Sequence, residues 1–145
     1  MDTQADRSLE QPFARLLGVT VESAEPGLVV GTLAWRPELC TSTGVLHGGA
    51  IMAFADSLGG LCAFLNLPPG ALTTTIESKT NFFRAVREGS LVGRCEPLHV
   101  GRSTIVVRTM VAAGERQVAH VVQTQAVLPP ARGGDAASPP PAAAT

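Results

Sequence analysis

Asp56 is the residue that stands out chemically, because it is the one charged group in an eighteen-residue apolar stretch, GGAIMAFADSLGGLCAFL, at 48–65. A carboxylate in apolar surroundings is costly unless it is paired, hydrogen-bonded or used. Such an isolated group is a candidate for catalytic work. The alternative is that Asp56 caps a neighbouring segment or reaches solvent at a subunit contact.

A glycine-rich loop, TGVLHGG at 43–49, leads directly into this apolar stretch. If the stretch is a helix, its first backbone N–H groups have no partner inside the helix, and the helix dipole favours negative charge there. Glycine lets another molecule approach the backbone closely. A carbonyl oxygen held at this point would be stabilised as it becomes an oxyanion. The alternative is an ordinary glycine-rich turn with a structural histidine.

Three segments in register carry a family resemblance. They are His47-Gly48-Gly49 followed nine residues after the histidine by Asp56, the stretch NFFRAVREG at 81–89, and HVGRS at 99–103. Together they resemble the hotdog-fold acyl-CoA thioesterases, and above all the phenylacetic-acid-degradation (PaaI-type) and 4-hydroxybenzoyl-CoA thioesterase branch. The resemblance covers residues 10–128.

The resemblance implies catalytic roles for four residues. Asp56 matches the carboxylate that acts as general base on water or as nucleophile on the thioester carbonyl. Gly48 matches the backbone N–H that polarises this carbonyl, and His47 belongs to the same catalytic motif. Thr75 falls where relatives place a Ser or Thr that helps to orient the water. Neither a metal nor a cofactor is implied.

The resemblance also implies residues that bind the substrate, an acyl-CoA. Arg84, Arg102 and Ser103 match positions that contact the CoA nucleotide, where guanidinium groups suit phosphates. Gly49 and Thr41 fall beside the oxyanion site. Relatives often carry Asn or Gln at the position of Thr41, and some carry Thr at the position of Gly60. Both departures lie near the acyl pocket, so the resemblance leaves the acyl group open among aryl, phenylacetyl and medium-chain groups.

Other functional classes find less support in the sequence. An acyl-CoA-sensing hotdog domain that binds without turnover would not need the acidic side chain of Asp56. A hotdog dehydratase would want its own histidine motif, such as His-Phe-Pro, which the chain lacks. A Cys–His hydrolase that pairs Cys40 or Cys62 with His47 has no supporting signature. His99 and His120 lie in strand patterns and are interpreted as structural or surface residues.

Composition excludes several further classes. With 11 Lys and Arg against 12 Asp and Glu, the net charge is −1, whereas nucleic-acid binders normally have a basic surplus. The three cysteines form an odd count without a C-x-x-C pair, so neither a disulfide framework nor a zinc finger is indicated. The polar first residues lack the apolar region of a secretory signal. We therefore expect a soluble cytoplasmic protein.

The elements that must position these residues alternate between strands and one long helix. The pattern predicts a short helix at 11–17 and strands at 19–24, 28–36, 72–83, 90–98, 103–112 and 116–128. The stretch 48–65 is apolar on every side, so it is predicted to be a helix buried all round. A membrane-spanning helix fits its length but not its central charge and four glycines.

We therefore predict an α+β hotdog fold, in which an antiparallel sheet wraps around one long central helix. The domain spans residues 10–128. Residues 1–9 are expected to be a flexible N-terminus. Residues 129–145 contain five Pro and six Ala and none of Val, Ile, Leu, Phe or Met, so they are expected to be a disordered tail.

The predicted helix also bears on assembly. Gly48 and Asp56 are eight residues apart, which is about 12 Å along a helix axis. Groups that act on one atom must converge within roughly 3 Å of it, so one helix cannot bring the two together. Two antiparallel helices related by a two-fold axis can. We expect a homodimer with shared active sites, and the resemblance implies that such dimers pair again into a homotetramer.

Overall fold

A computed structural model describes residues 11–130 of the chain. The elements follow the order expected from the sequence: a short helix, two strands, the long helix and four strands. They are α2 (Pro12–Leu17), β1 (Val19–Glu25), β2 (Leu28–Ala34), the 3-10 helix η1 (Pro37–Leu39), α3 (Gly48–Leu65), β3 (Leu72–Phe82), β4 (Ser90–Val100), β5 (Thr104–Ala113) and β6 (Arg116–Leu128). The expected flexible segment 1–9 and nearly all of the expected tail lie outside the described residues.

Predicted and observed boundaries agree within two residues, and those of α3 and β6 are identical. Gly18 ends α2 in the left-handed conformation, with φ at 81°, which glycine adopts at little cost. The sequence did not predict η1, nor the short bridge between Cys40 and Leu46 that closes the loop before α3.

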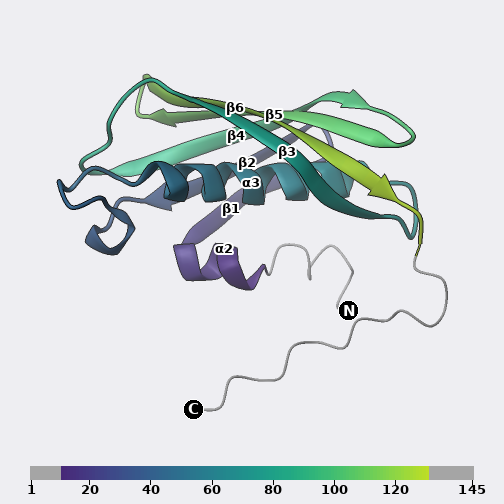
Figure 1. Cartoon of the computed structure of the whole chain (residues 1–145), viewed down its shortest axis with the longest axis horizontal. Coiled ribbons are helices and arrows are strands. Elements are labelled where there is room, and N and C mark those ends of the chain that lie inside the picture. Colours follow the sequence, from purple (N-terminus) through teal and green to yellow (C-terminus); the bar gives the residue numbers. More distant parts are fainter. Residues whose placement is uncertain (1–10, 131–145) are drawn as a thin grey trace, which may run out of the picture.

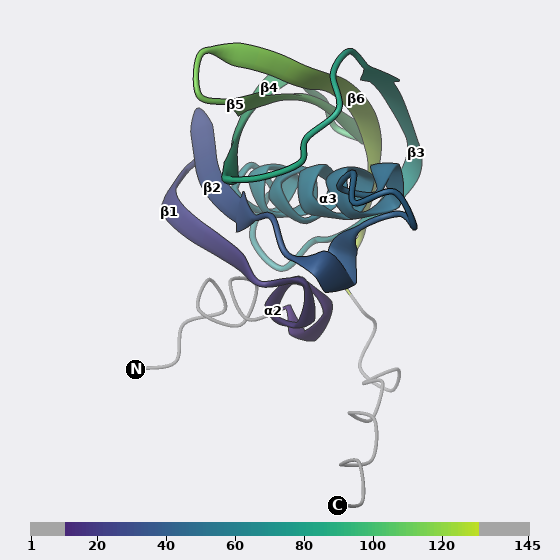
Figure 2. The same ribbon diagram turned by 90° about the vertical axis from the view of Figure 1, so that its left-hand side faces the viewer.

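The six strands form one antiparallel sheet in the order β1-β2-β4-β5-β6-β3. Figure 1 shows α3 lying along the inner face of this sheet. Seen along the helix in Figure 2, the sheet curves over α3 from β1 on one side to β3 on the other, and α2 lies beneath on the β1 side. The expected architecture, an antiparallel sheet wrapped around one central helix, is confirmed.

The core lies between α3 and the concave face of the sheet. Phe54 and Leu58 of α3 have no exposed surface, and neither have Ile105 and Val107 of β5. By length and composition alone, α3 could also cross a membrane. Its packing inside the sheet makes it the core helix of the domain.

The expectation that α3 is buried all round is wrong for the described chain. Gly49, Met52 and Asp56 are exposed, and they lie three and four residues apart along one side of the helix, where neighbouring turns align. The six strands curve over only part of the helix circumference. They leave this exposed strip next to the edge strand β3, so Asp56 is not enclosed by its own chain.

Close helix–sheet contact requires a small residue at Gly93 of β4. A Cβ atom placed on Gly93 would lie 2.5 Å from Cδ1 of Leu58 and 2.9 Å from the ring of Phe54. These separations are shorter than van der Waals contact. A methyl group there would push the helix away from the sheet.

We therefore expect Gly93→Ala to lower the free energy of unfolding by about 1–3 kcal/mol, the usual cost of overpacking a core. Urea unfolding measures this loss. Gly27→Ala is the matched control, because a Cβ atom there meets nothing within 4 Å. Equal stability of the two variants would contradict the tight packing of α3.

Candidate active site

Asp56 is held by side chains from two neighbouring strands. Its Oδ1 atom accepts a hydrogen bond from Thr75 Oγ1 of β3 at 3.2 Å and another from Gln123 Nε2 of β6 at 2.9 Å. No group in the described part of the chain donates to Oδ2. Asp56 is exposed, and its carboxylate therefore has one anchored oxygen and one that is open.

At the N-terminus of α3, one backbone N–H is left open. The N–H of Gly49 donates to Nδ1 of His47 at 2.9 Å, and those of Ala50 and Ile51 donate to the carbonyl oxygen of His47. Within residues 11–130, the Gly48 N–H has no acceptor. His47 is thus the N-cap of α3, and Gly48 offers the free donor at the positive end of the helix dipole.

The Gly48 N-terminus borders a surface hollow of about 370 Å³, whose lining includes Thr41, Phe82 and Arg84. A Cβ atom on Gly48 would lie 3.2 Å from Cζ of Phe82, so glycine keeps the backbone accessible beside this ring. Arg84 donates from Nη1 to the carbonyl oxygen of Gln117 at 2.8 Å. The fold thus brings three of the predicted residues together, and we call Thr41, Gly48 and Arg84 the amide end of the site.

Two other predicted residues, His47 and Gly49, flank Gly48 at the start of α3. The rest lie farther along the sheet. Asp56 and Thr75 form what we call the carboxylate end of the site, about 12 Å from Gly48 by helix rise. Arg102 and Ser103 occupy the turn between β4 and β5, and Ser103 accepts from the N–H of Val127. Both the strand that follows this turn and the end of β3 before Arg84 pair with β6. Their partners in β6 are seven residues apart, which corresponds to roughly 23 Å. One chain therefore does not unite the two ends.

Comparison with known proteins places this geometry in a family. The sequence pattern of the thioesterase superfamily matches residues 43–120, which include both ends of α3. The chain belongs to the thioesterase superfamily. It is therefore a thioester hydrolase, and the suspected family relation is confirmed at that level.

Individual relatives support the assignment. The proofreading thioesterase EntH of Klebsiella pneumoniae is 31% identical over 97 residues, which cover 67% of this chain and 71% of that protein. EntH of Cronobacter sakazakii is 39% identical over 88 residues, or 61% and 64% of the two chains. The structure of conserved protein PA5202 from Pseudomonas aeruginosa superposes with a TM-score of 0.80 at 30% identity, covering 84% of this chain and 98% of that one.

Two residues that touch this candidate site were missed in the sequence. Gln123 and Gln125 of β6 have 0% and 1% exposed surface. They share the inner face of the strand with Ala119 and Val121, because side chains two residues apart point the same way. Glutamine at core-facing positions is itself a signal, since buried amides require partners. The strand predicted at 116–128 did not show which of its two faces is buried, so this signal was overlooked.

The cysteines do not form a nucleophilic pair with His47. Cys62 and Cys95 are completely buried, and hydrogen bonding to Cys62 together with burial raises the pKa of the Cys95 thiol. Cys40 donates from Sγ to the carbonyl oxygen of Arg36 at 3.3 Å. Among the described residues, no three His, Cys, Asp or Glu side chains gather as metal ligands.

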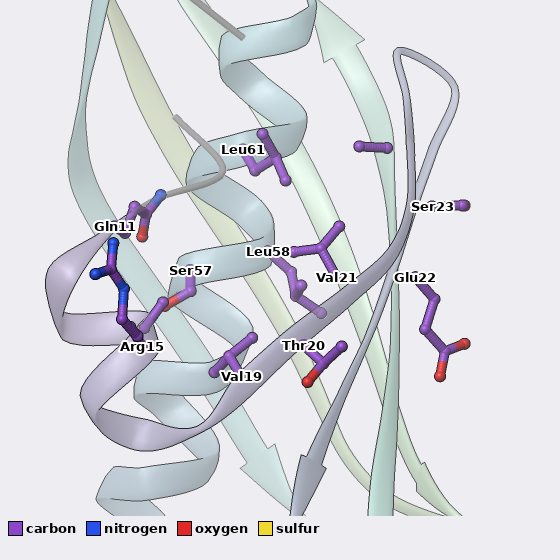
Figure 3. A pocket seen from close by; sticks show the side chains of 12 residues that line it. Gln11, Arg15, Val19, Thr20, Val21, Glu22, Ser23, Ser57, Leu58 and Leu61 are labelled. Atoms are coloured by element: carbon purple, nitrogen blue, oxygen red, sulfur yellow. The ribbon is translucent and has the colours of Figure 1, made fainter. Parts of the chain in front are cut away.

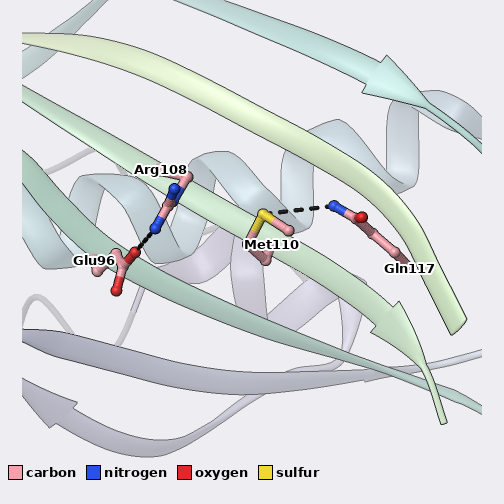
Figure 4. A network of polar contacts seen from close by, with 4 residues as sticks. All are labelled: Glu96, Arg108, Met110 and Gln117. Carbon is pink, nitrogen blue, oxygen red and sulfur yellow. Dashed lines mark hydrogen bonds and ion pairs between the residues drawn. The ribbon is translucent and has the colours of Figure 1, made fainter. Parts of the chain in front are cut away.

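Two other features lie away from the site. A larger hollow of about 490 Å³ lies between α2, β1 and one side of α3, and none of the predicted site residues lines it (Figure 3). On the sheet, Arg108 is paired with Glu96, and the Gln117 amide donates to Sδ of Met110 at 3.6 Å (Figure 4). In β5, Arg108 and Met110 alternate with buried residues, so this network faces away from α3.

The cap at His47 gives a prediction. We expect His47→Ala to lower the free energy of unfolding by about 1 kcal/mol, the usual cost of losing an N-cap, and to lower turnover because the first turn of α3 loosens around Gly48. His47→Asn should restore both, since asparagine is a favoured N-cap. Urea unfolding and steady-state kinetics measure the two effects. If His47→Asn is as stable as the native chain but as inactive as His47→Ala, the capping role does not explain the activity. The imidazole would then take part in the reaction itself.

Proposed function

We propose that this thioesterase hydrolyses the thioester of a small aryl- or medium-chain acyl-CoA to the free acid and CoA. The observation that carries the proposal is the pair of open groups on one side of α3: Oδ2 of Asp56 and the N–H of Gly48. A base or nucleophile and an oxyanion donor are what thioester cleavage needs. The relatives named proofreading thioesterase support thioester hydrolysis as the reaction.

In the proposed reaction, the Gly48 N–H donates to the thioester carbonyl oxygen. Asp56 either takes a proton from the attacking water or attacks the carbonyl carbon itself, in which case water cleaves the resulting anhydride. Negative charge develops on the carbonyl oxygen beside the positive end of α3. When the tetrahedral intermediate collapses, the C–S bond breaks and the CoA thiolate leaves. Thr75 steadies Asp56 and helps to orient the water.

The two reactive groups lie too far apart to act within one chain, so the proposal includes a homodimer. The exposed strip of α3 lies beside β3, an edge strand whose Leu72, Ile76 and Phe82 are 44%, 59% and 49% exposed. An uncovered edge strand with exposed apolar side chains is a surface that proteins normally pair or protect. A second copy related by a two-fold axis would cover it and bring Gly48 of each chain to Asp56 of its partner. A homotetramer would then be a pair of such dimers.

This antiparallel pairing also suits the binding of CoA. It brings the Arg84 end of one chain toward the Arg102 and Ser103 turn of the other, so that guanidinium groups from both could hold the phosphates of the nucleotide. The three cysteines are free, which is usual in a reducing compartment. This supports the proposal that the enzyme acts in the cytoplasm.

The first test is thiol release from benzoyl-, phenylacetyl- and hexanoyl-CoA, followed with a chromogenic disulfide. We expect Asp56→Asn to lower kcat by on the order of 10²-fold or more, because the amide can act neither as base nor as nucleophile. Glu77→Gln is the matched control, since it removes a carboxylate of β3 that is bound to Thr124 instead. Full activity in Asp56→Asn would refute the assigned role.

The second test addresses the shared site. Asp56→Ala and Gly48→Pro chains are co-expressed with different tags, and the mixed dimer is isolated on both tags. Each parent dimer is expected to be inactive, whereas the mixed dimer should regain about half of the native activity, because one of its two sites is intact. Light scattering checks the assembly. A mixed dimer as inactive as its parents, or a fully active monomer, would contradict the shared site.

A further inference from the structure

We infer that Gln123 is a positioning residue for Asp56. In this inference, Gln125 sets the orientation of the Gln123 amide, and residue 59 is glycine so that this amide can reach the carboxylate of Asp56. The inference rests on the proposed role of Asp56. It concerns residues of β6 and of the middle of α3 that the family resemblance did not assign.

The directions of the hydrogen bonds follow from the chemistry of the groups. An ionised carboxylate only accepts, so Gln123 must turn its NH₂ group toward Oδ1 of Asp56, as found at 2.9 Å. Its Oε1 atom then faces inward and needs a donor. Gln125 supplies this donor from Nε2 at 3.2 Å, which prevents the Gln123 amide from flipping.

Gln125 also fixes the second group that holds Asp56. Its Nε2 atom donates to Thr75 Oγ1 at 2.8 Å, so one of the two lone pairs of that hydroxyl is occupied and its hydrogen is directed to Oδ1 of Asp56 at 3.2 Å. The hydroxyl of Thr73 lies 2.9 Å from the carbonyl oxygen of Ala126 and 3.2 Å from Oε1 of Gln125, between which its hydrogen is shared. The side-chain amides of Gln123 and Gln125 find these partners in only one orientation. The Gln123 amide and the Thr75 hydroxyl then both donate to Oδ1 of Asp56.

Gly59 leaves the space that the Gln123 amide occupies. A Cβ atom on Gly59 would lie 1.7 Å from Oε1 and 2.4 Å from Cδ of Gln123. At the neighbouring Gly60, a Cβ atom would meet nothing within 4 Å. Glycine inside a helix is destabilising relative to alanine, so its presence at 59 needs a reason. The passage of the amide across the helix toward Asp56 provides that reason.

This arrangement controls which oxygen of Asp56 can react. With both donors on Oδ1, rotation of the carboxylate is restrained and Oδ2 is the oxygen left without a donor among the described residues. Without them, the carboxylate can rotate about its terminal torsion, which is broad when nothing restrains it. Misplacement of a reacting group by about 1 Å can cost on the order of 10²-fold in rate. The loss should therefore fall on kcat, whereas KM should change little.

The experiment compares Gly59→Ala and Gln123→Met in the thiol-release assay, with unfolding measured for each variant. Gly59→Ala displaces the Gln123 amide without changing its chemistry and should make the helix backbone more favourable. Gln123→Met keeps the side-chain length but removes the donor. We expect both folded variants to lose at least about tenfold in kcat, with KM within about twofold. Gln117→Met, the same change on the outer face of β6, should leave both constants unchanged.

A double-mutant cycle tests whether Gly59 acts through Gln123. In the Gln123→Ala background the amide is absent, so adding Gly59→Ala should lower kcat no further. Additive losses, or a folded Gly59→Ala variant with native kcat, would overturn the inference. If Gln123→Met does not fold, Gly59→Ala and the cycle still decide. Asp56→Asn is measured alongside: its full activity would refute the proposed function, whereas an inactive Asp56→Asn with an unaffected Gly59→Ala would refute the positioning role alone.

Discussion

The contact between α3 and the concave face of the sheet is the constraint on which the other features depend. Phe54 and Leu58 lie one turn apart and point into the core, which fixes the rotation of the helix about its axis. This rotation puts Asp56 at the boundary between the buried and exposed sides. Its carboxylate can therefore be hydrogen-bonded by β3 and β6 through one oxygen while the other faces outward. A helix buried on all sides would have enclosed the carboxylate, and a helix packed on one strand would have left it unrestrained.

The edge strand β3 meets two demands that a regular strand could not. Thr75 faces Asp56, and Phe82 faces Gly48, so both side chains point toward α3. Thr75 and Phe82 are seven positions apart, however, and in a regular strand side chains an odd number of positions apart point to opposite faces. The irregularity between Thr75 and Glu77 resolves this conflict. It inserts one residue, Ile76, as bulges do at sheet edges and beside active sites. The inner residues of β6 then pair with inner residues of β3 on both sides of the bulge.

Much of this could be predicted from the sequence, because it depends on local patterns. The limits of α3 followed from the apolar run at 48–65 behind a glycine-rich loop. Asp56 stood out as the one charge in that run, and the family resemblance implied its role and that of Gly48. What failed depends on the curvature of the sheet and the register of its strands. The hydropathy of the run shows that α3 is apolar, but it does not show how far six strands reach around the helix. The exposed strip was therefore not predicted. The inward orientation of Gln123 depends on the β6 register, and the facing of Thr75 and Phe82 depends on the bulge at Ile76.

The exposed strip links the chemistry to assembly. Oδ2 of Asp56 and the N–H of Gly48 are both open, and both belong to one rigid helix, so no side-chain rotation can close the axial distance of about 12 Å between them. A single carbonyl group can touch only one of them at a time. In the proposed dimer, the missing half of each site comes from a second α3 in antiparallel orientation, which carries the complementary group. Two-fold symmetry would then complete both sites at once, and the same contact would remove the strip and the β3 edge from water. The proposed dimer thus joins burial of exposed surface and completion of the site in one event.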